Sequence, residues 1–167
     1  MPSTILPAIA ILTGTFISGA SLSNCWFSLP IFLATLTPAT VPSTLDSFAL
    51  LQSYADPIFP LTTLATTLLH WTHAYRVYSA SGDEWVGYAC AGAATLCIIP
   101  FSIAVIFPTV GKIEAVQKRV EGKKADKEDE VEEVRGLLRS WNSQHMVRGL
   151  FPLIGAVIGA LALAREL

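Results

Sequence analysis

Long stretches without a charged residue alternate with short charged segments along this chain, and they determine which elements the sequence predicts. The first 45 residues contain no Lys, Arg, Asp or Glu. Three further uncharged intervals lie between the pairs Asp56 and Arg76, Glu84 and Lys112, and Arg148 and Arg165. An ionised side chain at the centre of a bilayer costs roughly 2.5 to 3.5 kcal/mol, so uncharged intervals of this length indicate membrane-spanning helices.

These intervals predict an all-α fold, with a single integral membrane domain over residues 1–167 in which four helices form a bundle. The expected spans are residues 5–29, 56–76, 86–107 and 146–164. Their lengths are close to the roughly 17 to 25 residues that cross a hydrocarbon core of about 30 Å. Residues 109–145 form a charged connection. From Val134 onward its apolar residues recur at helical spacing, which predicts an amphipathic cytosolic extension that runs directly into the last span.

The composition supports the membrane interpretation and excludes several other classes. Of the 167 residues, 52% are hydrophobic and only 14% are charged, whereas soluble proteins carry about 25% charged residues. The net charge of −2 leaves no basic surplus for a nucleic-acid partner. Three cysteines cannot pair completely, which argues against a disulfide-stabilised secreted domain.

The Lys and Arg residues orient the predicted bundle. Eight of the eleven lie between residues 109 and 147, and loops rich in these residues stay on the cytosolic side of a membrane. The connection 109–145 and the loop 30–55 are therefore expected to be cytosolic, and both termini luminal or external. The first segment lacks the basic start of a secretory signal. The mixed-charge run 121–133 is expected to be a solvated helix or loop, with a calcium or partner site as the alternative.

Polar residues gather on one face of the first two predicted spans. Within the second span, Asp56 and Pro57 have the character of a helix start, where an acidic cap and a proline are both favoured. His70 and His73 could share a metal ion, but metal sites need three or four ligands, so we predict hydrogen-bonded histidines and no metal. In the first span Asn24 requires a partner or ligand. The packing face of the first span comprises Gly14, Ser18, Ser21, Cys25 and Ser28, and the polar stripe of the second comprises Asp56, Thr63, Thr66, His70 and His73.

The last two spans carry the features that indicate a site. Pro100 interrupts the third span, and a proline inside a membrane helix commonly bends it beside a cavity. One face of the fourth span presents Trp141, His145 and Arg148 ahead of the Gly155–Gly159 pair, which permits close approach of another helix. Asp56 is a geometric candidate for the partner of the arginine. The alternatives are an arginine that reaches to the interface and an interfacial tryptophan.

Two segments carry a resemblance to a known family. They are Ile99-Pro100-Phe101-Ser102 through Phe107-Pro108-Thr109, and the pattern W-x-x-x-H-x-x-R-G that runs from Trp141 to Gly149. Together with the serine- and glycine-rich first span, they resemble the anthrone oxygenase family of small four-helix membrane proteins. Val110-Gly111 stand where that family often has asparagines.

The resemblance implies an enzyme that oxidises a polyketide-derived anthrone to an anthraquinone with molecular oxygen as co-substrate and without any cofactor. It further implies fungal secondary metabolism, and we expect an endoplasmic reticulum protein that contacts membrane lipid, with a homo-oligomer possible. We expect His145 to act as the base and Arg148 to stabilise the enolate, with Trp141 stacked on the polycycle. Asn24, Asn142 and Asp56 complete the expected binding residues. The alternatives are a noncatalytic membrane scaffold and, ranked last, a small transporter.

Overall fold

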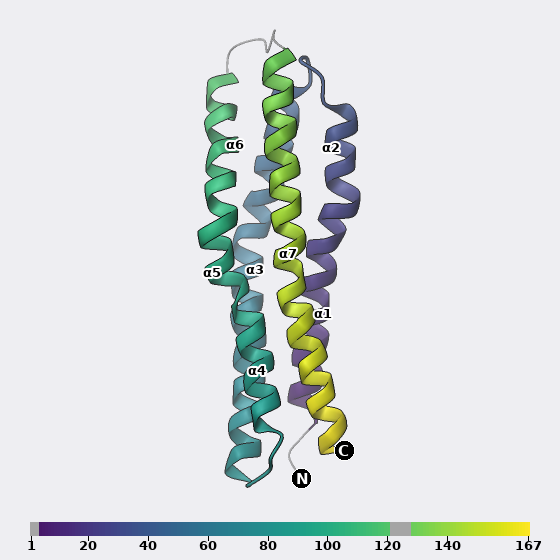
Figure 1. Ribbon diagram of the computed structural model, residues 1–167, viewed down its shortest axis with the longest axis vertical. Coiled ribbons are helices and arrows are strands. Elements are labelled where there is room, and N and C mark those ends of the chain that lie inside the picture. The colour runs from purple at the N-terminus through teal and green to yellow at the C-terminus, as the bar shows by residue number, and fades with distance from the viewer. Residues whose placement is uncertain (1–3, 121–127) are drawn as a thin grey trace.

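Four long helical rods run up and down in one elongated bundle (Figure 1). The computed structural model describes residues 4–120 and 128–167. The first rod contains α1 (Ile5–Ser23), the π-helical turn η1 (Asn24–Ser28) and α2 (Leu29–Thr35), and the second is α3 (Val41–Ser79). The third contains α4 (Trp85–Leu96), α5 (Ile98–Phe101), the π-helical turn η2 (Ser102–Ile106) and α6 (Phe107–Val120), and the fourth is α7 (Glu128–Glu166). The prediction of an all-α four-helix bundle is confirmed.

Three of the rods are long and apolar enough to cross a membrane, and they are Ile5–Thr35, Trp85–Val120 and Glu128–Glu166. The fold is therefore compatible with a membrane protein. The remaining rod, α3, contains the predicted span 56–76, whose hydroxyl and imidazole groups lower its mean hydropathy. Most of its polar stripe is nevertheless on the inside: Thr63, His70 and His73 are fully buried, whereas Leu61 and Leu68 are exposed. Asp56, at the start of the stripe, is exposed. The predicted two-sided character of this segment is confirmed.

The helices extend well beyond the predicted spans, and this corrects the expected loops. Residues 30–55 are helical except around 36–40, so Asp56 and Pro57 lie in the middle of α3 and the prediction that they start a helix is wrong. Pro30 falls in the first turn of α2, a position that tolerates proline. The part of 109–145 that the structure describes is also helical, in α6 and in the first half of α7. Of the mixed-charge run 121–133, residues 121–127 lie outside the described residues and 128–133 belong to α7.

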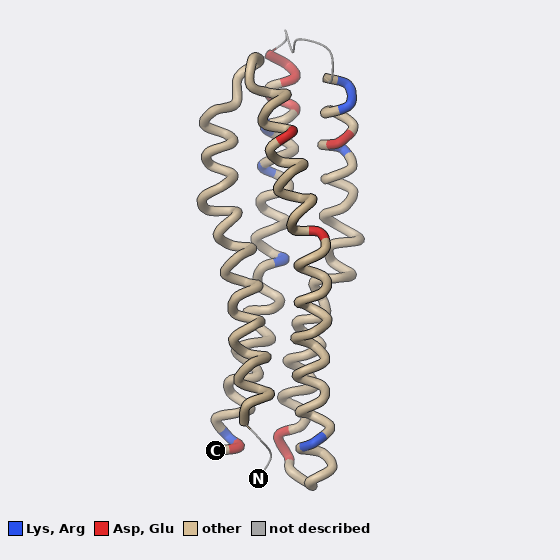
Figure 2. Tube along the Cα trace, turned by 180° about the vertical axis from the view of Figure 1, so that it is seen from behind, with Lys and Arg blue, Asp and Glu red and all other residues tan. Residues whose placement is uncertain are grey.

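A large apolar core explains why the helices are longer than the spans. At one end of the bundle α2, α3, α6 and α7 bury a cluster that includes Val41, Leu45, Phe48, Ile113 and Leu138. Figure 2 shows that most charged residues gather toward the two ends of the bundle. With its 39 residues α7 is roughly 58 Å long, about twice the thickness of a hydrocarbon core. The end that holds this cluster therefore extends beyond the apolar length that a membrane would cover.

Small residues let the rods approach closely at the middle of the bundle and at the end opposite the apolar cluster. A Cβ atom added to Gly155 would lie 2.7 Å from the carbonyl oxygen of Ala91 in α4, and one added to Gly159 would lie 2.7 Å from Cε1 of His70. On α1, a Cβ at Gly14 would lie 3.2 Å from the carbonyl oxygen of Pro152. The predicted packing faces of the first and fourth spans are confirmed.

Candidate functional site

Trp141, His145 and Arg148 form one buried cluster on α7. The three side chains are 2%, 1% and 8% exposed. Arg148 Nη2 lies 3.1 Å from His145 Nε2, and the indole of Trp141 stacks on the imidazole with 4.4 Å between ring centroids and 27° between planes. Phe48 of α3 packs edge-on against the indole at 5.1 Å. The face that the sequence singled out is therefore assembled as one unit inside the bundle.

The contact between His145 and Arg148 determines which ring nitrogen of the His145 imidazole carries a proton. A guanidinium can only donate hydrogen bonds, so Nε2 accepts and the ring proton resides on Nδ1. Nδ1 has no hydrogen-bond partner among the described residues. The imidazole is therefore neutral, and its lone pair is directed at Arg148.

A cavity of about 350 Å³ lies beside this cluster, between α3 and the segment that runs from α5 to the start of α6. Arg148 forms part of its wall, and the segment after Pro100 contains the π-helical turn η2. The predicted association of Pro100 with a cavity is confirmed, because residues on both sides of that proline line it. The lining residues are Gln52, Ala55, Asp56, Phe59, Pro60, Ile98, Ile99, Ser102, Ile103, Phe107 and Arg148.

Few polar groups reach this largely apolar cavity. The guanidinium carbon of Arg148 lies 5.0 Å from the centroid of the Phe59 ring, a cation–π geometry. Asp56 is within electrostatic reach of Arg148, although no ion pair joins the two within the described part of the chain. Ser102 donates to the carbonyl oxygen of Ile98 at 2.7 Å. Among the described residues, Asp56 and Arg148 are thus the two charged groups on the cavity wall.

The remaining predicted binding residues do not line the cavity. Trp141 lies behind it, against His145. Asn24 belongs to η1, where its Oδ1 accepts a hydrogen bond from Ser28 at 3.4 Å. Asn142 accepts a hydrogen bond at its backbone oxygen from Cys25 at 3.7 Å, and its own Oδ1 is buried without a partner among the described residues. The structure therefore brings Asp56 and Arg148 to the cavity and leaves the two asparagines apart from it.

Sequence reasoning missed Gln52 and Ser102 as cavity residues. Ser102 falls within the segment that carried the family resemblance, so a signal for it existed. Gln52 lies one helical turn before Asp56 and on the same side of α3, but residues 30–55 were expected to be a loop. Gln52 lies beside the carboxylate of Asp56 only because α3 continues through residues 41–55 as one helix.

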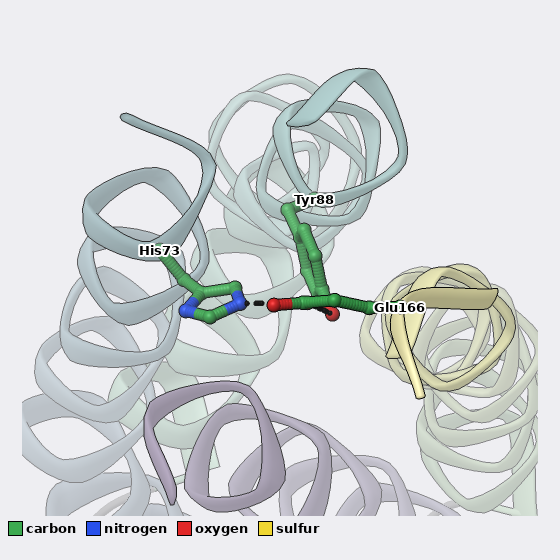
Figure 3. Close-up of polar contacts among 3 residues, drawn as sticks. All are labelled: His73, Tyr88 and Glu166. Carbon is green, nitrogen blue, oxygen red and sulfur yellow. Dashed lines mark hydrogen bonds and ion pairs between the residues drawn. The ribbon is translucent and has the colours of Figure 1, made fainter. Parts of the chain in front are cut away.

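A second polar cluster lies at the other end of the bundle, formed by His73, Tyr88 and Glu166 (Figure 3). His73 Nε2 lies 3.1 Å from Glu166 Oε2, and the phenol of Tyr88 donates to the same oxygen at 2.7 Å. Both nitrogens of His70 are buried without a hydrogen-bond partner in the described segments, so the prediction of hydrogen-bonded histidines is confirmed for His73 and wrong for His70. His73 and His145 therefore belong to different clusters. No group of three His, Cys, Asp or Glu side chains placed to hold a metal occurs among residues 4–120 and 128–167.

Comparison with known proteins identifies relatives over nearly the whole chain. A family model described as anthrone oxygenase matches residues 48–158. Anthrone oxygenase AgnL2 of Paecilomyces divaricatus is 32% identical over 96% of this chain and 96% of its own length. Anthrone oxygenase nsrD of Aspergillus novofumigatus is 31% identical over 98% and 96%, and monooxygenase hypC of Dothistroma septosporum is 35% identical over 94% and 82%. No solved structure matches the chain.

Proposed function

This chain belongs to the anthrone oxygenase family, and we propose that it oxidises a polyketide-derived anthrone to the corresponding anthraquinone with molecular oxygen. The observation that supports this most directly is a buried cation, Arg148, on the wall of a largely apolar cavity. A flat polycyclic ketone fits the apolar lining, and a developing oxyanion is stabilised by a guanidinium that water screens poorly.

The chemistry requires a base and an oxyanion stabiliser. The methylene of an anthrone lies between two aryl rings and is conjugated to a carbonyl, so a modest base removes a proton and leaves an electron-rich anthrolate. That anion reduces oxygen, and a carbon–oxygen bond forms to give a hydroperoxide at the former methylene. Loss of the remaining C–H proton breaks the O–O bond, which yields the quinone carbonyl and one water. We propose that no flavin, haem or metal takes part.

The cavity geometry favours a specific division of roles. Arg148 lines the cavity and is the proposed stabiliser of the enolate and peroxide oxygens. His145 does not line it, and its Nε2 accepts from Arg148, which argues against the base role expected from the sequence. We therefore assign proton removal to Asp56, the carboxylate on the cavity wall. His145 and Trp141 act as positioning residues that hold the guanidinium.

The test compares variants in membranes supplied with emodin anthrone and oxygen, with the spontaneous oxidation rate subtracted. We expect Arg148→Gln to lower kcat by about 10²–10³, the usual effect of removing an oxyanion donor. Asp56→Asn is expected to lower kcat as well, while Glu133→Gln, on the exposed surface of α7, serves as the matched control. A wild type no faster than spontaneous oxidation of emodin anthrone and of other anthrones would remove the proposed activity.

Variants of His145 distinguish the two candidates for the base, which are Asp56 and His145 itself. If it only positions Arg148, His145→Gln retains a hydrogen-bond acceptor and keeps most of the activity that His145→Ala loses. If His145 is itself the base, both variants lose activity equally and Asp56→Asn has little effect. Burial of Trp141, His145 and Arg148 disfavours the scaffold alternative, which places these side chains among lipid headgroups.

We further propose an endoplasmic reticulum protein in contact with membrane lipid, with the charged end of the bundle in the cytosol. The support is the positive-inside bias of residues 109–147. Protease digestion of sealed microsomes tests this, because only cytosolic segments are cleaved. Light scattering of the purified protein in detergent determines whether it is a homo-oligomer.

A further inference from the structure

The cavity beside Arg148 is open on the side of the bundle. Its floor is buried, since Ile98 is 4% and Arg148 8% exposed. Its rim is not, because Ile103 is 59% and Phe107 51% exposed, and Pro60 on α3 is exposed as well. A path therefore leads from the outer surface of the bundle, between α3 and the η2 segment, to the guanidinium.

Exposed aromatic residues indicate where the faces of a membrane would lie relative to this opening. Tyr54 is 67% and Tyr75 70% exposed on α3, and they are 21 residues apart, roughly 32 Å of helix. Tyrosine and tryptophan concentrate at the two interfaces of a bilayer whose hydrocarbon core is about 30 Å thick. Between them the exposed residues of α3 include Ile58, Leu61 and Leu68. The opening, at residues 52–60 of α3, thus coincides with one interface.

The polarity of the opening changes along the bundle axis. Gln52 and Asp56 line the cavity at the end nearer the charged part of the bundle, and Pro60 lines it one turn further into the apolar part. On the facing rod, which runs in the opposite direction (Figure 1), Ile98 and Ile99 lie at that same deeper level. The cavity is therefore polar toward the charged end of the bundle and apolar toward its middle. A bilayer interface changes from polar to apolar in the same order.

We propose that the substrate enters sideways from the membrane through this opening, with Ile103 and Phe107 as the residues that admit it. This inference rests on the proposed function and specifies its substrate as a flat polycycle that partitions into the bilayer. Its apolar rings face Ile98, Ile99 and Ile103. Its carbonyl and the adjoining hydroxyls face Arg148 and Gln52, and its methylene faces Asp56. The phenolic hydroxyls of such a compound favour the interface, so substrate concentrates at the depth of the opening.

The experiment places the full-length protein in lipid nanodiscs and narrows the opening with Ile103→Trp and, separately, Phe107→Trp. Val157→Trp is the matched control, because Val157 is 52% exposed on α7 and does not line the cavity. We expect both rim variants to lower kcat/KM for emodin anthrone about ten-fold or more, the effect of filling a fitted space, and the control to match the wild type.

Two further measurements make the result independent of turnover and of folding. Emodin, the anthraquinone product, is titrated into each nanodisc sample, and its binding is expected to weaken in the rim variants and not in Val157→Trp. At fixed total substrate, additional lipid is expected to lower the wild-type rate, because the substrate that enters is the membrane-dissolved fraction. Circular dichroism checks that each variant is folded.

The outcomes distinguish this inference from the proposed function. Rim variants that equal Val157→Trp in emodin binding and in kcat/KM would overturn sideways access, as would a wild-type rate that added lipid does not lower. A wild type without oxygenase activity would remove the proposed reaction, while the emodin titration would still decide whether this opening admits a polycycle.

Discussion

Gly155 offers the sharpest test of the packing that holds α7 against α4. A Cβ atom at this position would lie 2.2 Å from Thr95 Oγ1 and 2.7 Å from the carbonyl oxygen of Ala91. Rotation of Thr95 could relieve the first contact, but its hydroxyl donates to that same carbonyl at 3.0 Å and the bond would be lost. The second contact is with backbone, so the two helices must move apart.

The magnitude of the Gly155→Ala effect follows from two opposing contributions. Overpacking of a close contact lowers the free energy of unfolding by about 1–3 kcal/mol. Replacement of glycine by alanine within a helix raises it by up to about 1 kcal/mol. Gly19 supplies the matched control, since it lies in α1 with nothing within 4 Å of the position of an added Cβ. Gly19→Ala should therefore be neutral or slightly stabilising, and the two variants should differ by about 1–3 kcal/mol in free energy of unfolding.

The assay is denaturation of the purified protein in mixed detergent micelles, followed by far-ultraviolet circular dichroism for wild type and both variants. Gly155→Ala is expected to unfold at a lower denaturant fraction than the other two. If it is as stable as Gly19→Ala, the contact between α7 and α4 is looser than described. Because Gly155 lies on the same helix as Arg148, a measurable loss of oxygenase activity should accompany the loss of stability.

Three further substitutions test other contacts. Tyr88→Phe removes the phenol that donates to Glu166 and should cost about 1–3 kcal/mol in unfolding free energy, measured by the same denaturation; an unchanged transition would contradict the hydrogen bond. Trp141→Leu removes the ring stacked on His145 and should lower oxygenase activity with little change in emodin binding, since the indole does not line the cavity. Arg119→Gln breaks an exposed ion pair and should change stability by less than about 1 kcal/mol, so a larger loss would show that the pair is not solvent-screened.

The interior faces of the spans were predictable because helical periodicity alone determines which residues share a side. Thr63, His70 and His73 recur at the spacing of one face and are buried, while Leu61 and Leu68 lie on the opposite face and are exposed. No knowledge of neighbouring helices is needed for this result, since a helix that buries one of these groups turns the others inward too.

Helix boundaries were not predictable for a reason seen at Asp56. An acid followed by Pro57 has the local character of a helix start, yet α3 begins at Val41. Val41, Leu45 and Phe48 pack into a core with α6 and α7, and this burial outweighs the local signal. A cue that depends on a few neighbouring residues cannot report contacts with helices that lie far along the chain.

The composition and spacing of this chain by themselves determined an all-helical bundle, the polar and apolar faces of its helices, and the association of Trp141, His145 and Arg148 on one side of α7. These properties depend on residues a few positions apart, which a single helix brings together. Only the tertiary structure determined which residues of other helices each face contacts. Phe48 and His145 enclose the indole, Arg148 reaches a cavity that α3 and the η2 segment form, and Asp56 rather than His145 lies on its wall. Such contacts depend on the relative rotation and depth of separate rods, and the packing of the whole bundle sets both.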